Sequence, residues 1–302
     1  MSAALANAPG IRAGAARTPG WRDPARIGWL AFTLAAAAFF LLPLYVMGVT
    51  SLKGMEEIRA GQVFALPARP TFDAWRAAWG SACTGVDCLG LAPGFWNSVQ
   101  IVIPSTLIAV ALGAINGYAL SFWRVRGAGW VFGVLLLGAF LPVQVMMYPL
   151  VRMLAPLQLV GSLPGIVLVH VVFSMPVMTL LFRNYYASLP RELFHAARSD
   201  GAGFVRIFVQ LMLPLSLPML AVAAILQATG VWNDYLLGLV FAGREHLPMT
   251  VQLNNLVNTT TGTRAYDIDM AATLLASAAP LLLYAFAGRW FVRGIAAGAL
   301  KG

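Results

Sequence analysis

The sequence predicts an all-α protein, a polytopic bundle of six transmembrane helices, because it carries little charge, long apolar runs and an uneven distribution of basic residues. Of its 302 residues, 60% are hydrophobic and 10% are charged, whereas a soluble domain averages about 25% charged residues. The apolar runs are long enough to cross about 30 Å of hydrocarbon as helices. Nucleic-acid binding is not expected despite the net charge of +9, because the basic residues lie in short loops between these runs.

Six apolar runs are expected to span the membrane. They cover residues 27–50, 97–122, 130–150, 162–182, 213–240 and 270–291. Helices are expected because a helix satisfies its own backbone hydrogen bonds in lipid. The first run exceeds the apolar part of a cleaved signal peptide, which is about 7–15 residues, so we expect it to be retained. Residues 1–26, rich in Arg, Ala, Gly and Pro, are predicted to form a disordered cytoplasmic tail.

The basic residues between the spans predict how the chain lies in the membrane. One side carries 13 of them: Arg12, Arg17, Arg22, Arg26, Arg124, Arg126, Arg183, Arg191, Arg198, Arg206, Arg289, Arg293 and Lys301. The other side carries seven: Lys53, Arg59, Arg69, Arg76, Arg152, Arg244 and Arg264. Because the more basic side faces the cytoplasm, both termini are predicted to be cytoplasmic in a multi-pass protein of a bacterial inner membrane. Segments 51–96 and 242–269 are then external.

Both cysteines, Cys83 and Cys88, lie in the first external segment. An oxidising compartment favours a disulfide between them, and the alternative is two free thiols. A metal site is not expected, because no His or further Cys lies near them in the sequence. No catalytic residues are expected anywhere in the chain.

The longest cytoplasmic loop, 183–212, shows the pattern of a helical hairpin. Pro190 suits the beginning of a helix, and Leu193, Phe194 and Ala197 recur at helical spacing on one apolar face. Gly201 interrupts this pattern, and it allows a turn either through a positive φ or through close approach of another backbone. A second amphipathic stretch then leads into the fifth span. An exposed apolar face of this kind is suited to docking a partner.

This loop resembles the cytoplasmic loop of binding-protein-dependent ABC importer permeases. That family has the pattern Glu-Ala-Ala, three residues, Gly, nine residues, Ile, one residue, Leu-Pro; the matching residues here are Ala196, Ala197, Gly201, Leu213 and Pro214, with Leu211 in the Ile place and His195 in the Glu place. The segment WNDYLLGLVF at 232–241 and the ending FVRGIAAGALKG at 291–302 resemble the maltose-type carbohydrate subfamily. The stretch at 251–262 is similar to glucose/mannose-type permeases.

The resemblance implies a type I ABC importer permease fold and a function. Residues 95–302 would form the five-helix core with its coupling loop, after a first span and external loop at 27–94. The chain would move a sugar, such as glucose or mannose, from an extracellular solute-binding protein, together with a second homologous permease and two ATPase subunits. The chain itself has no G-x-x-x-x-G-K-[ST] phosphate loop and no expected cofactor. The residues implied to dock on the ATPase are Leu193, Phe194, His195, Ala196, Ala197, Asp200, Gly201 and Ala202.

Two other classes of function are weaker alternatives. An ion-coupled secondary transporter would need intramembrane ionisable groups, for which Asp234 and His170 are the main candidates, but no repeat of two halves is visible. A membrane-embedded enzyme would need a catalytic or metal constellation, and the three histidines show no metal-binding spacing.

Several polar residues within the apolar runs are candidates for the translocation path: Gln227, Asn233, Asp234 and Tyr235. The alternative for Asp234 is a structural cap, and for Gln227, Asn116 and Gln144 it is hydrogen bonding between helices. Trp232 and Tyr235 are expected either to anchor at the membrane interface or to stack on a sugar. His195 is expected to face solvent or a subunit interface.

Overall fold

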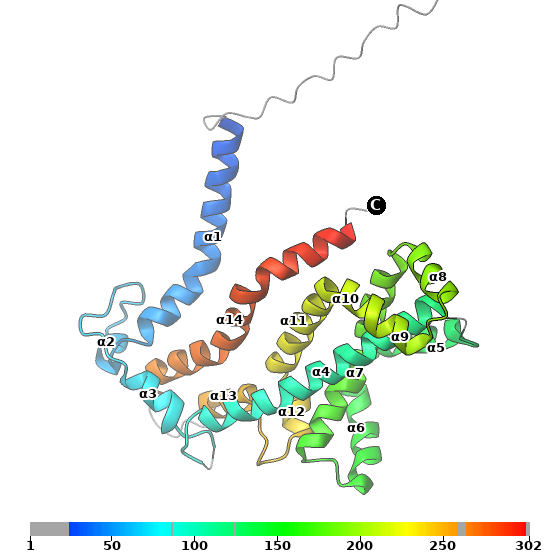
Figure 1. The fold of residues 1–302 in the computed structure, drawn as a ribbon. Helices are drawn as coiled ribbons and strands as arrows, with labels where there is room; N and C mark the ends of the chain where they lie inside the picture. The colour runs from blue at the N-terminus through cyan, green and yellow to red at the C-terminus, as the bar shows by residue number, and fades with distance from the viewer. Residues whose placement is uncertain (1–23, 86, 124, 259–263, 300–302) are drawn as a thin grey trace, which may run out of the picture. The chain divides into compact units, whose positions relative to one another are not determined.

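The computed structural model describes residues 24–85, 87–123, 125–258 and 264–299, and these contain helices and no strand. The chain divides into two compact units, residues up to Met47 and Gly48–Gly302. The elements are α1 (Pro24–Thr50), α2 (Met55–Arg59), α3 (Asp73–Gly80), α4 (Ala92–Phe122), α5 (Ala128–Phe140), α6 (Val143–Leu154), η1 (Ala155–Leu157), α7 (Leu163–Ala187), α8 (Arg191–Ser199), α9 (Phe204–Ile207), the π-helical turn η2 (Phe208–Met212), α10 (Leu213–Leu215), α11 (Leu217–Asn233), α12 (Leu236–Phe241), α13 (Met249–Asn258) and α14 (Tyr266–Ala299) (Figure 1).

The predicted all-α transmembrane architecture is confirmed, but two of the six predicted spans are not single helices. Four helical segments are long and apolar enough to cross a membrane: Arg26–Thr50, Ala92–Phe122, Leu163–Ala187 and Tyr266–Gly288. Two further bent pairs raise the number to six if each pair counts as one span. Of the predicted N-terminal tail, residues 24–26 already belong to α1, and the rest lies outside the described residues.

The prediction of one continuous helix over 130–150 is wrong. This stretch forms α5 and α6, which meet at an angle of 110° around Leu141 and Pro142. Proline has no N–H to donate, and it disfavours helical geometry at the preceding residue. Leu141 accordingly adopts extended backbone with ψ of 125°. The third apolar run is therefore a broken span or a re-entrant pair.

The fifth predicted span, 213–240, also differs from a single helix. It bends by 78° around Ser216, where Pro214 and Pro218 each remove a backbone donor. The hydroxyl of Tyr185 donates to the Leu215 carbonyl at 2.6 Å, which satisfies one acceptor at the bend. The helix then ends at Asn233, and the remaining residues form the separate helix α12.

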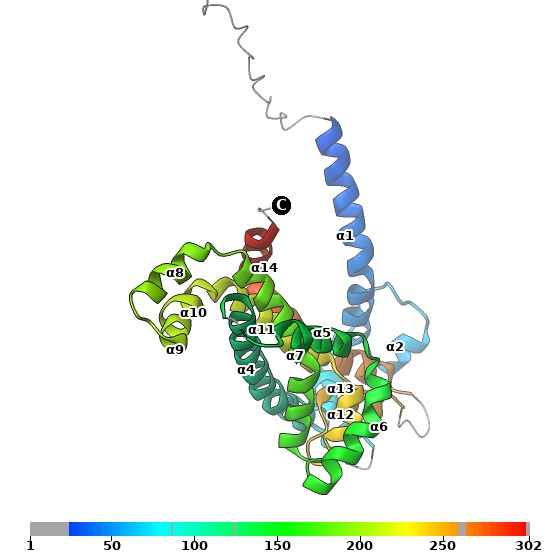
Figure 2. The same ribbon diagram turned by 90° about the vertical axis from the view of Figure 1, so that its right-hand side faces the viewer.

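The centre of the bundle is the packing of α4 against α7, which lie side by side (Figures 1 and 2). Gly113 and Gly117 of α4 face α7 so closely that an added Cβ would lie 2.6 Å from the Cβ atoms of Met178 and Phe182 respectively. Small residues four apart allow such close approach of membrane helices, where van der Waals packing replaces the hydrophobic effect. The two glycines thus fix the distance between the two helices.

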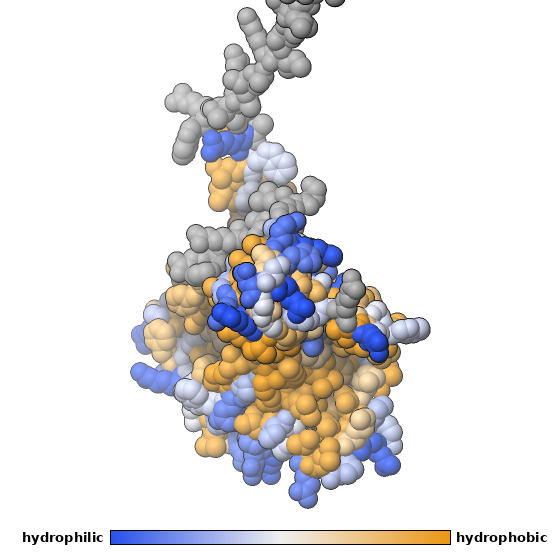
Figure 3. Space-filling view, turned by 45° about the vertical axis from the view of Figure 1, so that its right-hand side comes forward, coloured by the Kyte–Doolittle hydropathy of each residue, from blue (hydrophilic) through white to orange (hydrophobic). Residues whose placement is uncertain are grey.

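The segment between α1 and α4 packs against α14 within the second compact unit. Ala74 and Ala78 of α3 are buried in one apolar cluster with Ala271 and Ala272 of α14. Elsewhere, large apolar side chains of α5 remain exposed, among them Trp130 and Phe140, both 83% exposed. Figure 3 shows a broad apolar band of this kind between more hydrophilic ends, a surface that suits lipid or another apolar protein surface.

Candidate functional site

The predicted helical hairpin is present as α8, a glycine turn and α9. Gly201 has φ of +77°, its N–H donates to the Arg198 carbonyl at 3.0 Å, and the Ala202 N–H donates to the Ala197 carbonyl at 3.0 Å. This is the Schellman arrangement, in which a residue with positive φ closes the helix end. No atom lies within 4 Å of a Cβ built at Gly201, so the glycine is needed for its φ and not for close approach of another backbone.

The hairpin has an inner and an outer face. Phe194 is buried at 7% exposure, and its ring stacks on Phe122 of α4 at 4.9 Å. Ala197 and Ala202 also pack against this cluster, whereas Leu193, at 41% exposure, faces outward. The expectation that the whole apolar face needs a partner is therefore wrong for Phe194, which the chain buries itself. The other exposed members of the implied docking set are His195, Ala196, Asp200 and Gly201.

Asp234 acts as a structural cap within the described part of the chain. Its carboxylate accepts hydrogen bonds from the N–H groups of Leu237 at 3.3 Å and Gly238 at 2.9 Å, at the beginning of α12. The same carboxylate lies 3.9 Å from Nε2 of His170 on α7. The Asp234 carbonyl accepts a hydrogen bond from the Thr250 hydroxyl. Four segments thus meet at this residue, which we call the Asp234 joint.

The aromatic neighbours of the Asp234 joint have different environments. Trp232 is buried at 7% exposure, and its indole N–H donates to the Ala276 carbonyl of α14 at 3.0 Å. Its ring lies edge-on to Phe95 at 5.5 Å. Neither interfacial anchoring nor stacking on a sugar describes this tryptophan, because the core encloses it. Tyr235 is 37% exposed, and its hydroxyl donates to the Asn254 side chain at 3.3 Å.

The other polar candidates separate into bonded and unbonded side chains. Asn116 of α4 donates to the Thr179 hydroxyl of α7 at 3.5 Å, which is the helix-to-helix bond weighed as its alternative role. Gln227 is buried, Asn233 and Gln144 are exposed, and none of these three makes a side-chain hydrogen bond to a residue that the structure describes. Gln227 and Asn233 therefore keep polar groups available for a substrate or another subunit.

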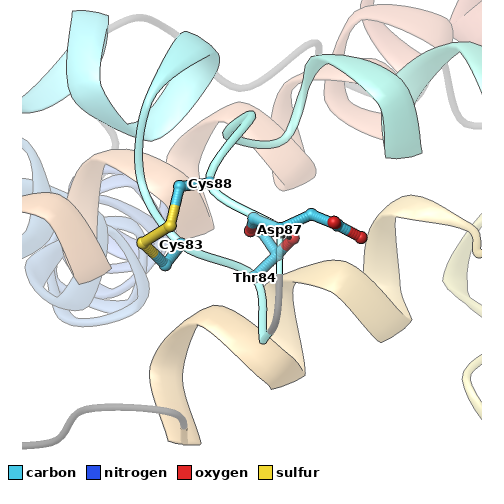
Figure 4. The surroundings of a disulfide bond; sticks show 4 residues. All are labelled: Cys83, Thr84, Asp87 and Cys88. Carbon is cyan, nitrogen blue, oxygen red and sulfur yellow. Dashed lines mark hydrogen bonds between the residues drawn. A yellow bond between two sulfur atoms is a disulfide. The ribbon is translucent and has the colours of Figure 1, made fainter.

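A cavity of about 400 Å³ lies between the cysteine loop, the beginning of α4 and the segment leading into α13. Cys83 and Cys88 are joined in a disulfide, and the side chain of Asp87 points away from it (Figure 4). Asp87 and Arg244, which both line the cavity, form an ion pair at 3.3 Å. No pattern in the sequence indicated this cavity, because its walls come from segments about 150 residues apart.

The structure places no three metal-ligating side chains together among the residues that it describes. His195 and His170 lie on separate helices, α8 and α7. The hairpin and the Asp234 joint are sites of contact and packing between helices.

Comparisons with known proteins agree on one family. Residues 107–297 match the family described as binding-protein-dependent transport system inner membrane component. The chain is 36% identical over 216 residues to an osmoprotective compounds uptake permease protein of Synechocystis, covering 70% of this chain and 71% of that protein. It is 30% identical over 280 residues to a glucose import system permease protein of Saccharolobus solfataricus, covering 90% and 94% respectively.

Solved structures share the fold. A bacterial ABC transporter involved in the import of the acidic polysaccharide alginate gives a TM-score of 0.69 at 20% identity, covering 90% of this chain and 99% of that chain. The methionine ABC transporter gives a TM-score of 0.54 at 17% identity over 68% of this chain.

Proposed function

The chain belongs to the binding-protein-dependent transport system inner membrane components, and from that membership we propose that it is the permease subunit through which a sugar-importing ABC transporter moves a neutral monosaccharide, such as glucose or mannose. It is an integral membrane protein that works with ATPase subunits, a second permease and a solute-binding protein, and it does not hydrolyse ATP itself. The observation that carries the proposal is the helical hairpin of α8 and α9, whose outer face stays exposed.

The ATPase contact is proposed for the outer face of this hairpin. Leu193, His195 and Ala196 are exposed on α8, and Asp200 and Gly201 follow at the turn. The resemblance also implied a docking role for Phe194 and Ala197. These two residues pack on the inner face of the hairpin, opposite the exposed outer face. A helix of nine residues is marginal alone in water, where about 12–15 residues are needed. Packing of the inner face against α4 stabilises α8. The helix can therefore be formed before its outer face binds a partner.

The cytoplasmic location of the hairpin and of both termini is likewise a proposal. It is supported by the excess of Arg on the side of the hairpin. It agrees with the disulfide between Cys83 and Cys88 on the opposite side, because disulfides persist in oxidising compartments. A map of the accessibility of single introduced cysteines that placed residue 300 outside the cell would overturn it.

Gln227, Asn233 and Tyr235 are proposed to line the translocation path. Support comes from the amides of Gln227 and Asn233, which have no hydrogen-bond partner in the described chain, and from the exposure of Tyr235. Asp234 contributes to the path by fixing the beginning of α12 and Thr250 of α13 beside these residues. A path lined by neutral amides suits a neutral polyhydroxyl substrate, which needs hydrogen-bond donors and acceptors and no countercharge.

Uptake of radiolabelled sugars by cells with and without this subunit tests the substrate. We expect glucose or mannose uptake to depend on the subunit and to require ATP. Uptake that persists after ATP depletion but stops when the proton or sodium gradient is dissipated would instead support an ion-coupled secondary transporter. Uptake of amino acids or metals alone would refute a sugar substrate.

Docking is tested by Ala196→Asp. If the outer face is buried against an ATPase subunit, the amount of ATPase co-purifying with the permease should fall at least about tenfold, because burying an unpaired carboxylate costs several kcal/mol. Ala60→Asp, at an exposed site in the segment after α2, is the control and should leave the ATPase bound. If Ala196→Asp lowers the stability of the permease while the ATPase remains bound, the hairpin is only a packing element of the permease.

A further inference from the structure

We propose that Trp123 is a positioning residue that attaches the hairpin to α4, so that the hairpin and α4 move together when the ATPase subunits act. This inference rests on the proposed function. The hairpin is joined through the backbone to α7 and α11, but α4 is not its neighbour in the chain. Beyond the packing of α4 on α7 and α11, the hairpin contacts α4 directly through aromatic side chains, and Trp123 lies where these side chains meet.

Trp123 directly follows the last residue of α4, and its ring contacts both helices of the hairpin. The ring centroid lies 5.7 Å from that of Phe194 on α8, edge-on at 83°. It lies 5.3 Å from that of Phe204 on α9. Aromatic pairs prefer edge-on and offset arrangements at these separations. The Trp123 side chain thus contacts both helices of the hairpin at the end of α4.

The residues around Trp123 strengthen the same attachment. Phe122 stacks on Phe194 at 4.9 Å with 22° between the ring planes. The Tyr118 hydroxyl, one turn earlier on α4, donates to the Phe204 carbonyl at 3.3 Å. Tyr118 is fully buried, so this end of α4 has no room to separate from the hairpin without exposing rings. We call Tyr118, Phe122, Trp123, Phe194 and Phe204 the aromatic latch.

Arg198 connects the latch to the docking segment. Its guanidinium carbon lies 4.8 Å from the centroid of the Trp123 ring, within the range of a cation–π interaction. Arg198 is itself an exposed residue of α8, on the helix that carries Leu193 and Ala196. A displacement of α8 at the outer face is therefore transmitted to Trp123 through the side chain of Arg198.

Within the latch, the Trp123 side chain contacts aromatic rings and the Arg198 guanidinium. The indole N–H is buried and has no hydrogen-bond partner among the described residues. A phenylalanine at this position would keep a ring without losing a hydrogen bond, whereas a leucine would keep apolar volume without a ring.

The test compares Trp123→Leu and Trp123→Phe in the complete importer, reconstituted in proteoliposomes with its ATPase, second permease and binding protein. Trp123→Leu should retain the bound ATPase, because the outer face is unchanged, while the glucose transported per ATP hydrolysed falls by about tenfold as the ring contacts are lost. Trp123→Phe should stay within about twofold of the wild type. Trp130→Leu, at an exposed site on α5, is the matched control. A wild-type ratio in Trp123→Leu overturns the proposal.

A second measurement does not depend on transport or on the docking of any other subunit. Spin labels at Ile115→Cys on α4 and Val205→Cys on α9, both exposed, report the distance between α4 and the hairpin, while both native cysteines stay in their disulfide. The distance distribution should be narrow in the wild type and in Trp123→Phe, and broad in Trp123→Leu. A narrow distribution in Trp123→Leu overturns the latch. If the wild type transports no sugar but this pattern of distances is observed, the proposed function fails and the attachment stands.

Discussion

The hairpin and the Asp234 joint are held in opposite ways. The hairpin is held from one side by aromatic rings and leaves its other face open. The joint is held by hydrogen bonds to a carboxylate and a carbonyl, and segments of α7, α12 and α13 close around it. Ring packing tolerates small displacements, whereas a capped helix end in a low-dielectric interior is intolerant of losing its partner. The contacts of the joint are therefore expected to tolerate less displacement than the ring contacts of the hairpin.

Removing the carboxylate of the joint should have the largest effect on stability. Asp234→Ala leaves the N–H groups of Leu237 and Gly238 without their acceptor, and each such group costs several kcal/mol in lipid. We expect the Tm of the purified complex in detergent to fall by several degrees and the yield to drop. Asn233→Ala, at the exposed neighbouring residue, should change neither. Equal stability of Asp234→Ala and Asn233→Ala would show that the joint contributes nothing to stability.

A bulky residue at the turn of the hairpin should have the next largest effect. Gly201→Trp places a side chain at φ of +77°, where residues other than glycine are destabilised by about 1–2 kcal/mol. We expect the permease to insert normally but to retain less ATPase and to import less sugar. Asparagine tolerates positive φ better than tryptophan does, so Gly201→Asn should lower ATPase binding and sugar import less. Normal assembly and transport by Gly201→Trp would mean that the turn is not part of the ATPase contact.

A smaller effect is expected where α11 is attached to α14. Trp232→Phe removes the bond from the indole to the Ala276 carbonyl but keeps a ring beside Phe95. A single hydrogen bond contributes about 1 kcal/mol, so the Tm should fall by a few degrees without loss of the bound ATPase. A large loss of transport at unchanged Tm would instead indicate that Trp232 takes part in the path.

The smallest effect is expected at the ion pair that lines the cavity beside the cysteine loop. Arg244→Gln breaks the pair with Asp87, whose two side chains are 71% and 60% exposed, and exposed pairs contribute about 0.2–1 kcal/mol. Tm should change by little at low salt and not at all at high salt, where the pair is screened. A loss of binding-protein-stimulated ATPase activity at unchanged Tm would show that this pair has a role beyond packing.

The sequence predicted features that depend on neighbours in the chain. The turn of the hairpin followed from Gly201 and the residues on either side of it, and the caps made by Asp234 reach N–H groups only three and four residues ahead. The burial of Phe194 did not follow, because its partner Phe122 lies in another span. The walls of the cavity beside the cysteine loop likewise come from segments that are distant in sequence.

The two broken spans show a different kind of failure. Pro142, Pro214 and Pro218 were visible in the sequence, but a long apolar run indicates only that a segment suits lipid and leaves the path of its backbone undetermined. Proline is tolerated inside membrane helices when neighbours satisfy the freed carbonyls. Proline also lies within α4, α7 and α14 without ending them. Whether a proline breaks a span therefore depends on its tertiary neighbours, which a single sequence does not contain.

One consequence follows from the length of α4. At its far end from Trp123, the Gly94 N–H donates to the Gln252 side chain at 3.0 Å, and the Ser98 hydroxyl accepts from the Met249 N–H at 2.8 Å. One end of α4 thus contacts the hairpin, and its other end is hydrogen-bonded to α13 (Figure 2). The helix α4 has 31 residues and is therefore about 46 Å long. A tilt of about 5° around its middle would move each end by about 2 Å in opposite directions, so a small stroke on one side of the membrane would open or close polar contacts on the other.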